Sequence, residues 1–218
     1  MVEKPIAITA AASQRLADMS RSRNTRFAAA HVFLFSRYLE NFSKLVADAG
    51  SVQFLRVQWT DPQSEKRYGE QKQYDPSLPV FADWLPHVLS MIGTLMPGLP
   101  QRCEKLKFLR GGSLLELELK LGDIPCSVQL IRNSDQRRRI IEVSAGQKML
   151  QLNFSKEPGI ITCGSATVVG DPDWEVKRRP AARMLTAFLT WAAGGVRDSR
   201  LDVEIGLRAN RVIDETLG

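Results

Sequence analysis

The segment 114–121 reads LLELELKL, so that from Leu115 onward every second residue is leucine. Strict alternation over this length predicts a β-strand that buries one face and exposes the other. Three later segments are rich in isoleucine and valine or alternate again, at 124–131, 139–143 and 149–154. Short turns that contain Gly, Asp or Asn separate these segments. We therefore predict an antiparallel meander in this part of the chain.

Apolar residues at helical spacing mark both ends of the chain and a segment near its middle. They predict helices at 8–22, 38–49, 83–95, 181–193 and 201–217. Thr9 is the expected N-cap of the first helix, and either Asp198 or Ser199 that of the last. In the third helix we expect Asp83 as N-cap and Pro86 in the first turn, where its missing N–H costs nothing.

The first half of the chain also contains two predicted strands. The run at 28–36 is continuously apolar and aromatic, as expected of a strand covered on both faces. Residues 52–59 begin to alternate and predict a second strand, which a polar loop at 61–79 follows. The predicted fold class is α+β, with an open, mainly antiparallel sheet, helices packed on one face and a short αβ segment in front.

Composition excludes several classes of protein. Of 218 residues, 44% are hydrophobic and 25% are charged, which is typical of a globular protein rather than a disordered chain or a coiled coil. No stretch approaches the roughly 20 apolar residues of a membrane span, and the N-terminal pattern is not that of a secretion signal. Cys103, Cys126 and Cys163 form no CxxC pair, so we expect neither disulfides nor a metal site. We expect a cytoplasmic protein with no membrane partner.

The net charge is +6, from 30 Lys and Arg against 24 Asp and Glu. Three basic clusters carry the excess, at 21–26, 137–139 and 177–179. A nucleic-acid reader would gather such charge on one face and interleave aromatic residues, whereas here only Trp174 lies near a cluster. We interpret the clusters as solvated turns and expect no nucleic-acid partner. DNA binding stays open as the third hypothesis, and its salt dependence would test it.

Two short motifs contain candidate catalytic groups. In Glu3-Lys4-Pro5 the proline fixes the backbone after a lysine whose ammonium can donate to a substrate oxygen or act as a general acid. Asp83 and His87 are four residues apart, which places a carboxylate and an imidazole on one side of the predicted helix as orienter and acid/base group. Structural interpretations stay open for all three: an exposed N-terminal lysine, an N-cap and a buried ring.

Other catalytic signatures are absent from the sequence. No serine or cysteine sits in a GxSxG turn, and no GxGxxG follows a strand, so the chain has no dinucleotide cradle of its own. We interpret His31, which lies inside a predicted buried strand, as structural.

Taken together, the motifs resemble the glucose-fructose oxidoreductase / inositol dehydrogenase family. In the first half the resemblance rests on EKP at 3–5 before an alanine-rich helix, HVFLFSRYL at 31–39, and Asp83-x-x-x-His87. In the second half it rests on a meander that ends in a loop with Trp174, then Arg179-Pro180, a helix, Gly194-Gly195 and GLRAN at 206–210. The resemblance spans nearly the whole chain in the order of the family.

Members of that family pair an N-terminal Rossmann half, which binds NAD or NADP, with a C-terminal α/β half that lines the substrate site. This sequence resembles the second half. The resemblance implies that residues 1–36 are the remnant of a Rossmann-type half and that 37–218 form a substrate-binding and dimerisation domain. Under this resemblance we expect gene truncation, a mis-set start codon or a split gene whose other product supplies the cofactor. We expect no tight binding of NAD or NADP by this chain alone, and no activity without the missing half.

The resemblance implies roles for single residues in the reversible oxidation of a secondary alcohol or reduction of a carbonyl or imine. Lys4 and Pro5 would hold the small-molecule substrate and the nicotinamide in register. Asp83 and His87 would be the substrate-facing acid/base pair. Three further residues are expected near the substrate: Arg37, Tyr38 and Trp174.

The alternative is a non-catalytic binding or assembly module that retains only the sheet. Leucines of the 114–121 strand would line one face of an open sheet and their neighbours the other, and an exposed apolar face usually signals a partner. We expect a homo-oligomer through this open face, or a separate cofactor-binding chain as partner. A stable monomer in light scattering would count against the module.

Overall fold

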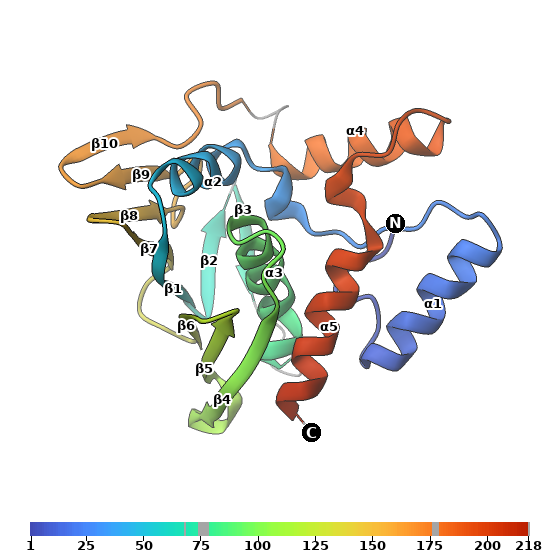
Figure 1. Cartoon of the computed structure of the whole chain (residues 1–218), viewed down its shortest axis with the longest axis horizontal. Coiled ribbons are helices and arrows are strands. Elements are labelled where there is room, and N and C mark those ends of the chain that lie inside the picture. The colour runs from blue at the N-terminus through green and yellow to red at the C-terminus, as the bar shows by residue number, and fades with distance from the viewer. Residues whose placement is uncertain (68, 74–78, 176–178, 218) are drawn as a thin grey trace.

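The computed structural model describes residues 1–67, 69–73, 79–175 and 179–217 (Figure 1). Its centre is an eight-stranded sheet in the order β10-β9-β8-β7-β1-β6-β5-β4, and a hairpin, β2-β3, extends beyond the end of β1. The strands are β1 (Val52–Asp61), β2 (Ser64–Arg67), β3 (Glu70–Gln73), β4 (Gln101–Leu109), β5 (Leu114–Leu121), β6 (Ile124–Arg132), β7 (Arg138–Ala145), β8 (Lys148–Asn153), β9 (Ile160–Cys163) and β10 (Ala166–Val169).

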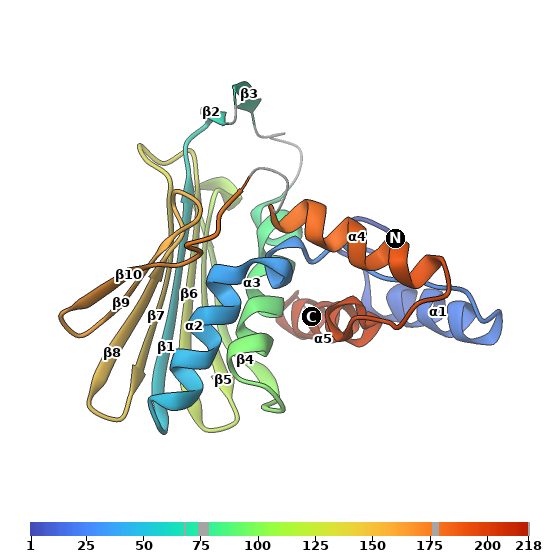
Figure 2. The ribbon, with the colours of Figure 1, turned by 90° about the horizontal axis from the view of Figure 1, so that it is seen from above.

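All five helices of the described chain lie on one side of this sheet. They are α1 (Ala10–Ser22), α2 (Arg37–Asp48), α3 (Val80–Leu95), α4 (Pro180–Ala192) and α5 (Val203–Leu217), with 3-10 turns η1 (Val32–Phe35), η2 (Arg110–Gly112) and η4 (Ser199–Leu201). Figure 2 shows α2 and α3 against the sheet and α1, α4 and α5 further out on the same side. The predicted α+β class is confirmed. Within the described ranges, no helix has the length and apolar content needed to cross a membrane.

The alternating strand β5 shows how the sheet is oriented. Its alternating leucines, from Leu115 to Leu121, are at most 2% exposed and belong to the core under the helices, whereas Glu118 between them is exposed. The same alternation in β1 and β7 puts Arg56 and Glu142 on the uncovered face. Over β1, β5, β6 and β7 the open face is therefore polar and not apolar as expected, whereas Met149 on β8 and Ile160 on β9 are exposed.

The predicted meander needs one correction, because β1 lies between β6 and β7. It runs parallel to β6, from Leu55 beside Cys126 to Asp61 beside Arg132, and antiparallel to β7. Thus β6 and β7 follow each other in the chain without being neighbours in the sheet. Pairing between distant segments leaves no local signal in the sequence, since turn residues such as 133–135 resemble those of a hairpin.

The apolar run at 28–36 is not the strand that we predicted. Only Ala29 pairs, in an isolated parallel bridge with Val2, and the chain then turns into η1 with His31 at its N-cap position. The run is apolar because most of it is buried: Leu34 is 2% exposed and Phe35 1%. An apolar run without a period indicates burial, not the type of element.

The two ends of the chain pack together. Thr9 caps α1 as predicted, since its Oγ1 accepts from the N–H of Ala12 at 3.2 Å. The N–H of Ala10 donates to Asp214 Oδ2 on α5 at 2.7 Å, so the first helix is tied to the last. Asp198 caps the 3-10 turn η4, and α5 begins after it, which corrects the predicted start of the last helix.

Helix α3 begins earlier than predicted. Pro79 is at its N-cap position and Val80 is its first residue, so Asp83 lies in the first turn and is not the cap. Pro86 then falls in the helix interior rather than the first turn. Burial favours the longer helix, because Val80 is 1% and Trp84 3% exposed in the core.

The predicted polar loop at 61–79 and the basic clusters are partly outside the described residues: 68, 74–78, 177 and 178 fall there. The described part of the loop forms the hairpin β2-β3.

In the cluster at 137–139 the solvated-turn interpretation was wrong for two arginines. Arg137 donates to Asp61 at 3.1 Å and to Glu65 at 2.9 Å, and Arg139 donates to Asp61 at 2.5 Å. Asp61 is 0% exposed, and a buried carboxylate requires such cations.

Candidate functional site

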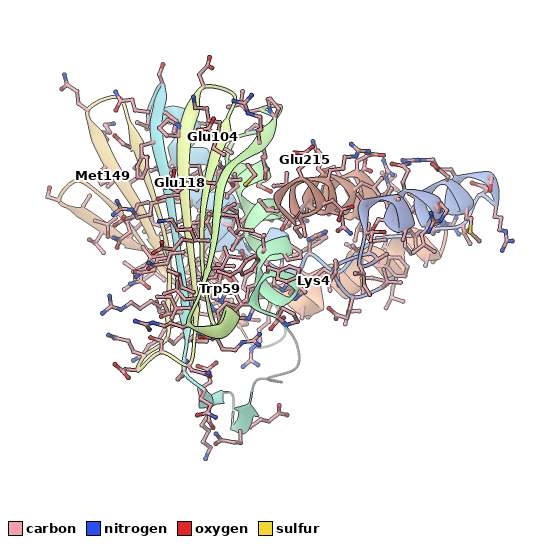
Figure 3. All side chains as sticks on the ribbon, turned by 90° about the horizontal axis from the view of Figure 1, so that it is seen from below. Lys4, Trp59, Glu104, Glu118, Met149 and Glu215 are labelled. Carbon is pink, nitrogen blue, oxygen red and sulfur yellow. The ribbon has the colours of Figure 1, made fainter. Side chains whose placement is uncertain are left out.

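A pocket of about 340 Å³ opens on the helix side of the sheet, where β1, β7, α3 and the start of α4 meet. We call it the His87 pocket. Its wall combines the aromatic rings of Phe33, Trp59, Trp84 and His87 with the charged side chains of Asp83, Arg139, Glu157 and Arg179. A small apolar hollow with a few polar groups of both signs is typical of a small-molecule site. In Figure 3, Trp59 and Lys4 are labelled, and Lys4 lies on the side of the helices.

Lys4 and Asp83, predicted from the two short motifs, meet in this region. Lys4 Nζ is 2.9 Å from Asp83 Oδ1, and Arg132 Nη2 is 3.1 Å from Asp83 Oδ2. The side chains of Lys4 and Arg132 are only 8% and 7% exposed. One carboxylate therefore holds two nearly buried cations, one on each oxygen.

The local structure of α3 explains how Lys4 reaches it. Proline inside a helix removes one backbone hydrogen bond and disturbs the turn before it. The ammonium of Lys4 donates to the backbone carbonyl of Asp83, three residues before Pro86. The N-terminal segment thus supplies a donor at the turn that the proline disturbs. Pro5 follows Lys4 through a cis peptide bond.

His87 lies one turn beyond Asp83 and is held by stacking. Its ring is parallel to Trp59, with centroids 6.2 Å apart and an angle of 4°, and stands edge-on to Phe33 at 5.0 Å. Nδ1 is buried and has no hydrogen-bond partner among the residues that the structure describes. Burial lowers the pKa of His87 well below its ordinary value, and the charge of Lys4 lowers it further. The structure pairs Asp83 with Lys4 and Arg132 rather than with His87.

The second histidine lies behind the same region. His31 is 2% exposed, and neither ring nitrogen has a hydrogen-bond partner among the described residues. Burial, with a smaller contribution from Lys4, lowers the pKa of His31 to about 4. Lys4 is thus close enough to act electrostatically on both histidines, and both imidazoles are neutral at neutral pH.

Arg139 is a pocket residue that sequence reasoning missed. Its guanidinium lies 4.1 Å from the ring centroid of Trp59, its neighbour in the sheet register, and is held from behind by Asp61. Trp59 Nε1 donates to the same carboxylate at 3.3 Å. Asp61 thereby fixes both a cation and an indole of the wall. No local motif marks this group, because its members come from different strands.

The other predicted substrate residues lie outside the lining of the pocket. Arg37 pairs with Asp173 at 2.7 Å on the surface, and Trp174 packs half-buried against the core. Tyr38 is buried, and its hydroxyl donates at 2.9 Å to Glu157, which does line the pocket. Burial and Glu157 raise the pKa of Tyr38 above its ordinary range. Substrate contacts of these residues stay predictions.

The described residues contain no group of three or more His, Cys, Asp or Glu side chains that could hold a metal ion. The polar atoms of the His87 pocket are instead those of arginine, histidine and two separate carboxylates. Such a set binds an organic substrate with oxygen atoms through hydrogen bonds and charge.

No family model matches the sequence, and no curated protein matches it either. Solved structures do match. A 3-ketoreductase from Actinomadura kijaniata, in complex with TDP-benzene and NADP, has a TM-score of 0.79 and 13% identity over 99% of this chain and 68% of that one. A UDP-N-acetylglucosamine 3-dehydrogenase from Acidithiobacillus ferrooxidans gives 0.74 and 16% over 99% and 69%. A dehydrogenase from Clostridium difficile gives 0.74 and 13% over 98% and 68%.

These similarities establish the architecture. The chain has the fold of oxidoreductases of the glucose-fructose oxidoreductase / inositol dehydrogenase type, so the resemblance stated from the motifs is confirmed at the level of the fold. Nearly all of this chain is aligned, while part of each similar chain has no counterpart in it.

Proposed function

We propose that this chain is the substrate-binding half of an NAD(P)-dependent oxidoreductase that interconverts a secondary alcohol and a carbonyl or imine. The observation that carries the proposal is that Asp83 and His87 line one pocket, while Lys4 from a distant segment pairs with Asp83 at its edge. The similar structures support it, because they are a ketoreductase solved with NADP and two dehydrogenases. A module that had kept only its sheet would have no need for this charged cluster.

In this proposal His87 is the acid/base group. Its lowered pKa keeps the imidazole neutral at neutral pH, so it can accept the proton of a substrate hydroxyl. Burial and the charges of Lys4 and Arg139 all disfavour the imidazolium that this transfer forms. When the reaction runs in the reverse direction, the imidazolium therefore readily donates its proton to a substrate oxygen. Lys4 places a positive charge where negative charge develops on that oxygen. Asp83 is a positioning residue, since both of its oxygens are occupied by Lys4 and Arg132.

The described residues do not fit a dinucleotide as well. A cavity of about 340 Å³ is at the lower end of the range for a small ligand. The parallel strands β1 and β6 lead into the strands β2 and β7, not into a glycine-rich turn and a helix, which a pyrophosphate cradle requires. We therefore assign NAD or NADP to a separate Rossmann-type unit and derive no hydride step from this chain.

The N-terminal segment is where we place that unit. Val2 and Ala29 form a single parallel bridge through two backbone hydrogen bonds of 3.0 and 2.9 Å. Parallel pairs occur in larger sheets that are covered on both faces. Near the bridge in sequence, Ile8 is 92% and Met19 47% exposed. Because Lys4 follows Val2 so closely, a parallel sheet that continues from this bridge would lie next to the His87 pocket.

The purified chain alone is expected to bind neither NADH nor NADPH tightly. Titration against nicotinamide fluorescence should show no saturable rise, because no cradle holds the pyrophosphate. Tight binding with turnover of small ketones by the chain alone would refute the half-enzyme proposal.

A fusion tests the catalytic part of the same proposal. The part of the Actinomadura kijaniata ketoreductase that has no counterpart in this chain, joined in front of Val2, should confer NADPH binding and ketone reduction. In that fusion His87→Asn should slow reduction by about a hundredfold or more. Arg15→Gln, at an exposed position of α1, is the matched control and should leave the rate unchanged. Equal rates for the two variants would remove His87 from the chemistry.

A second copy of the chain is the proposed partner of the uncovered sheet face. This face is free of helices (Figure 2) and carries a polar groove that includes Gln58 and Gln129. Around it Met149 is 55% and Ile160 50% exposed, a mixed surface that suits an isologous interface. We expect a dimer in analytical ultracentrifugation and dissociation on Gln129→Glu, which adds a carboxylate beside Glu116 in the groove of each copy. A monomeric wild-type chain would refute this interface.

A further inference from the structure

A second cavity lies between the C-terminal half of α3, the segment 96–101 and one face of α5, and we call it the Arg208 pocket. Its volume is about 340 Å³, and it shares no lining residue with the His87 pocket. Most of its wall is apolar and includes Leu89, Ile205 and Val212. Ile205, Arg208 and Val212 lie on one face of α5 because they are spaced three and four residues apart. Nothing in the proposed oxidoreductase reaction uses this cavity.

One buried acceptor in the wall lacks a partner. The side chain of Gln101 is fixed at one end, because its Nε2 donates to the Leu89 carbonyl at 3.1 Å. Its Oε1 is buried and accepts no hydrogen bond in the described part of the chain. Leaving a buried acceptor without a donor costs free energy. Because Gln101 lines the cavity, an N–H or O–H of a bound ligand is the donor that would satisfy this oxygen.

Helix α3 leaves room for this amide. Gly93 lines the cavity in the last turn of the helix, although glycine is a poor helix former. A Cβ at this position would lie 3.1 Å from Gln101 Nε2 and crowd it. Glycine at this position therefore lets the Gln101 amide keep its orientation and leaves the cavity unfilled.

One cation of the wall is free to meet an anion. Arg208 is exposed and makes no ion pair or hydrogen bond with any described residue. Its neighbour Arg211 already contacts Gln14 at 3.1 Å and Glu204 at 3.9 Å. Glu215, labelled on α5 in Figure 3, is the one acidic residue in the lining of the described chain. No described residue therefore neutralises the positive charge of Arg208.

We propose that the Arg208 pocket binds a small carboxylate with an apolar body and a hydrogen-bond donor at its far end. The carboxylate pairs with Arg208, the body packs against Leu89 and Val212, and the donor bonds to Gln101 Oε1. The carboxylate and the donor each meet a polar group of the wall, Arg208 and Gln101 Oε1, that no described residue satisfies. An apolar hollow with a few placed polar groups is the usual form of such a site.

Isothermal titration calorimetry with three matched probes tests this proposal. Indole-3-acetate carries the carboxylate, the apolar body and one N–H. Benzofuran-3-acetate lacks the N–H, and indole-3-acetamide lacks the charge. We expect the full chain to bind indole-3-acetate best and each of the other two about tenfold more weakly.

Two variants assign these preferences to residues. Gln101→Leu should remove the preference for indole-3-acetate over benzofuran-3-acetate. Arg208→Gln should remove the preference for indole-3-acetate over its amide, while Arg15→Gln, the same change elsewhere on an exposed helix face, should not. Unchanged thermal unfolding of Arg208→Gln would separate lost binding from lost folding. The proposal is overturned if indole-3-acetate shows no saturable binding up to millimolar concentration, or if both preferences survive in both variants.

Discussion

Replacing Asp83 by alanine is expected to lower the free energy of unfolding by about 3–5 kcal/mol. Lys4 and Arg132 each direct a cationic nitrogen at this carboxylate, and both side chains are nearly buried. Without the anion, two positive charges remain near each other in a region of low solvent access, where Arg132 also lies 5.3 Å from the ring centroid of Trp84. Urea unfolding at neutral pH, followed by circular dichroism, measures the loss.

A matched control separates this buried clamp from ordinary surface pairing. Asp173 pairs with Arg37 at 2.7 Å, but the side chain of Asp173 is 64% exposed, so Asp173→Ala should cost less than about 1 kcal/mol. Adding Lys4→Met to Asp83→Ala should recover part of the loss, because one buried charge disappears. Similar losses for Asp83→Ala and Asp173→Ala would show that the clamp does not stabilise the fold.

Elements with one buried face were the ones that the sequence predicted well. The leucines of β5 and the apolar stripe of α2 repeat with the period of their element because only one side meets the core. The run at 28–36 has no period, since the core and the N-terminal segment surround it, and it was mistaken for a strand. The position of β1 between β6 and β7 depends on pairing between distant segments, which no local pattern encodes.

The residues of the candidate site also fall into those that a local sequence pattern predicts and those that only the tertiary fold reveals. Lys4, Asp83 and His87 were predicted because each belongs to a short motif. Arg139 was not, because the sheet register alone places it beside Trp59. Arg132 did leave a signal: it continues the buried face of β6 two residues after Leu130. A charged residue at a buried position predicts a partner of opposite charge, but only the tertiary fold shows that this partner is Asp83.

The free energy of unfolding is expected to fall as the pH drops from about 6.5 towards about 4. Burial lowers the pKa of His31 from 6.5 to about 4 and lowers that of His87 as well. In this window the unfolded chain binds protons that the folded chain refuses, so stability is complete above the unfolded pKa and is lost on acidification. For His31 alone the loss is about 3 kcal/mol. The pKa of Asp198 is lowered from 3.8, so this carboxyl changes the free energy of unfolding only below pH 3.8, outside this window.

Urea unfolding at a series of pH values from neutral to about 4.5 measures this loss. The chain has two histidines, and His31→Phe removes one of these two titrating sites. The free energy of unfolding should therefore change less steeply with pH in this variant. Lys4→Met tests the electrostatic contribution: it should reduce the pH dependence slightly, because burial is the larger cause at both rings and Lys4 the next. A wild-type curve that stays flat through this range, or a slope unchanged in His31→Phe, would mean that His31 is protonated in the folded chain. It would then have to gain a partner that the structure does not give it.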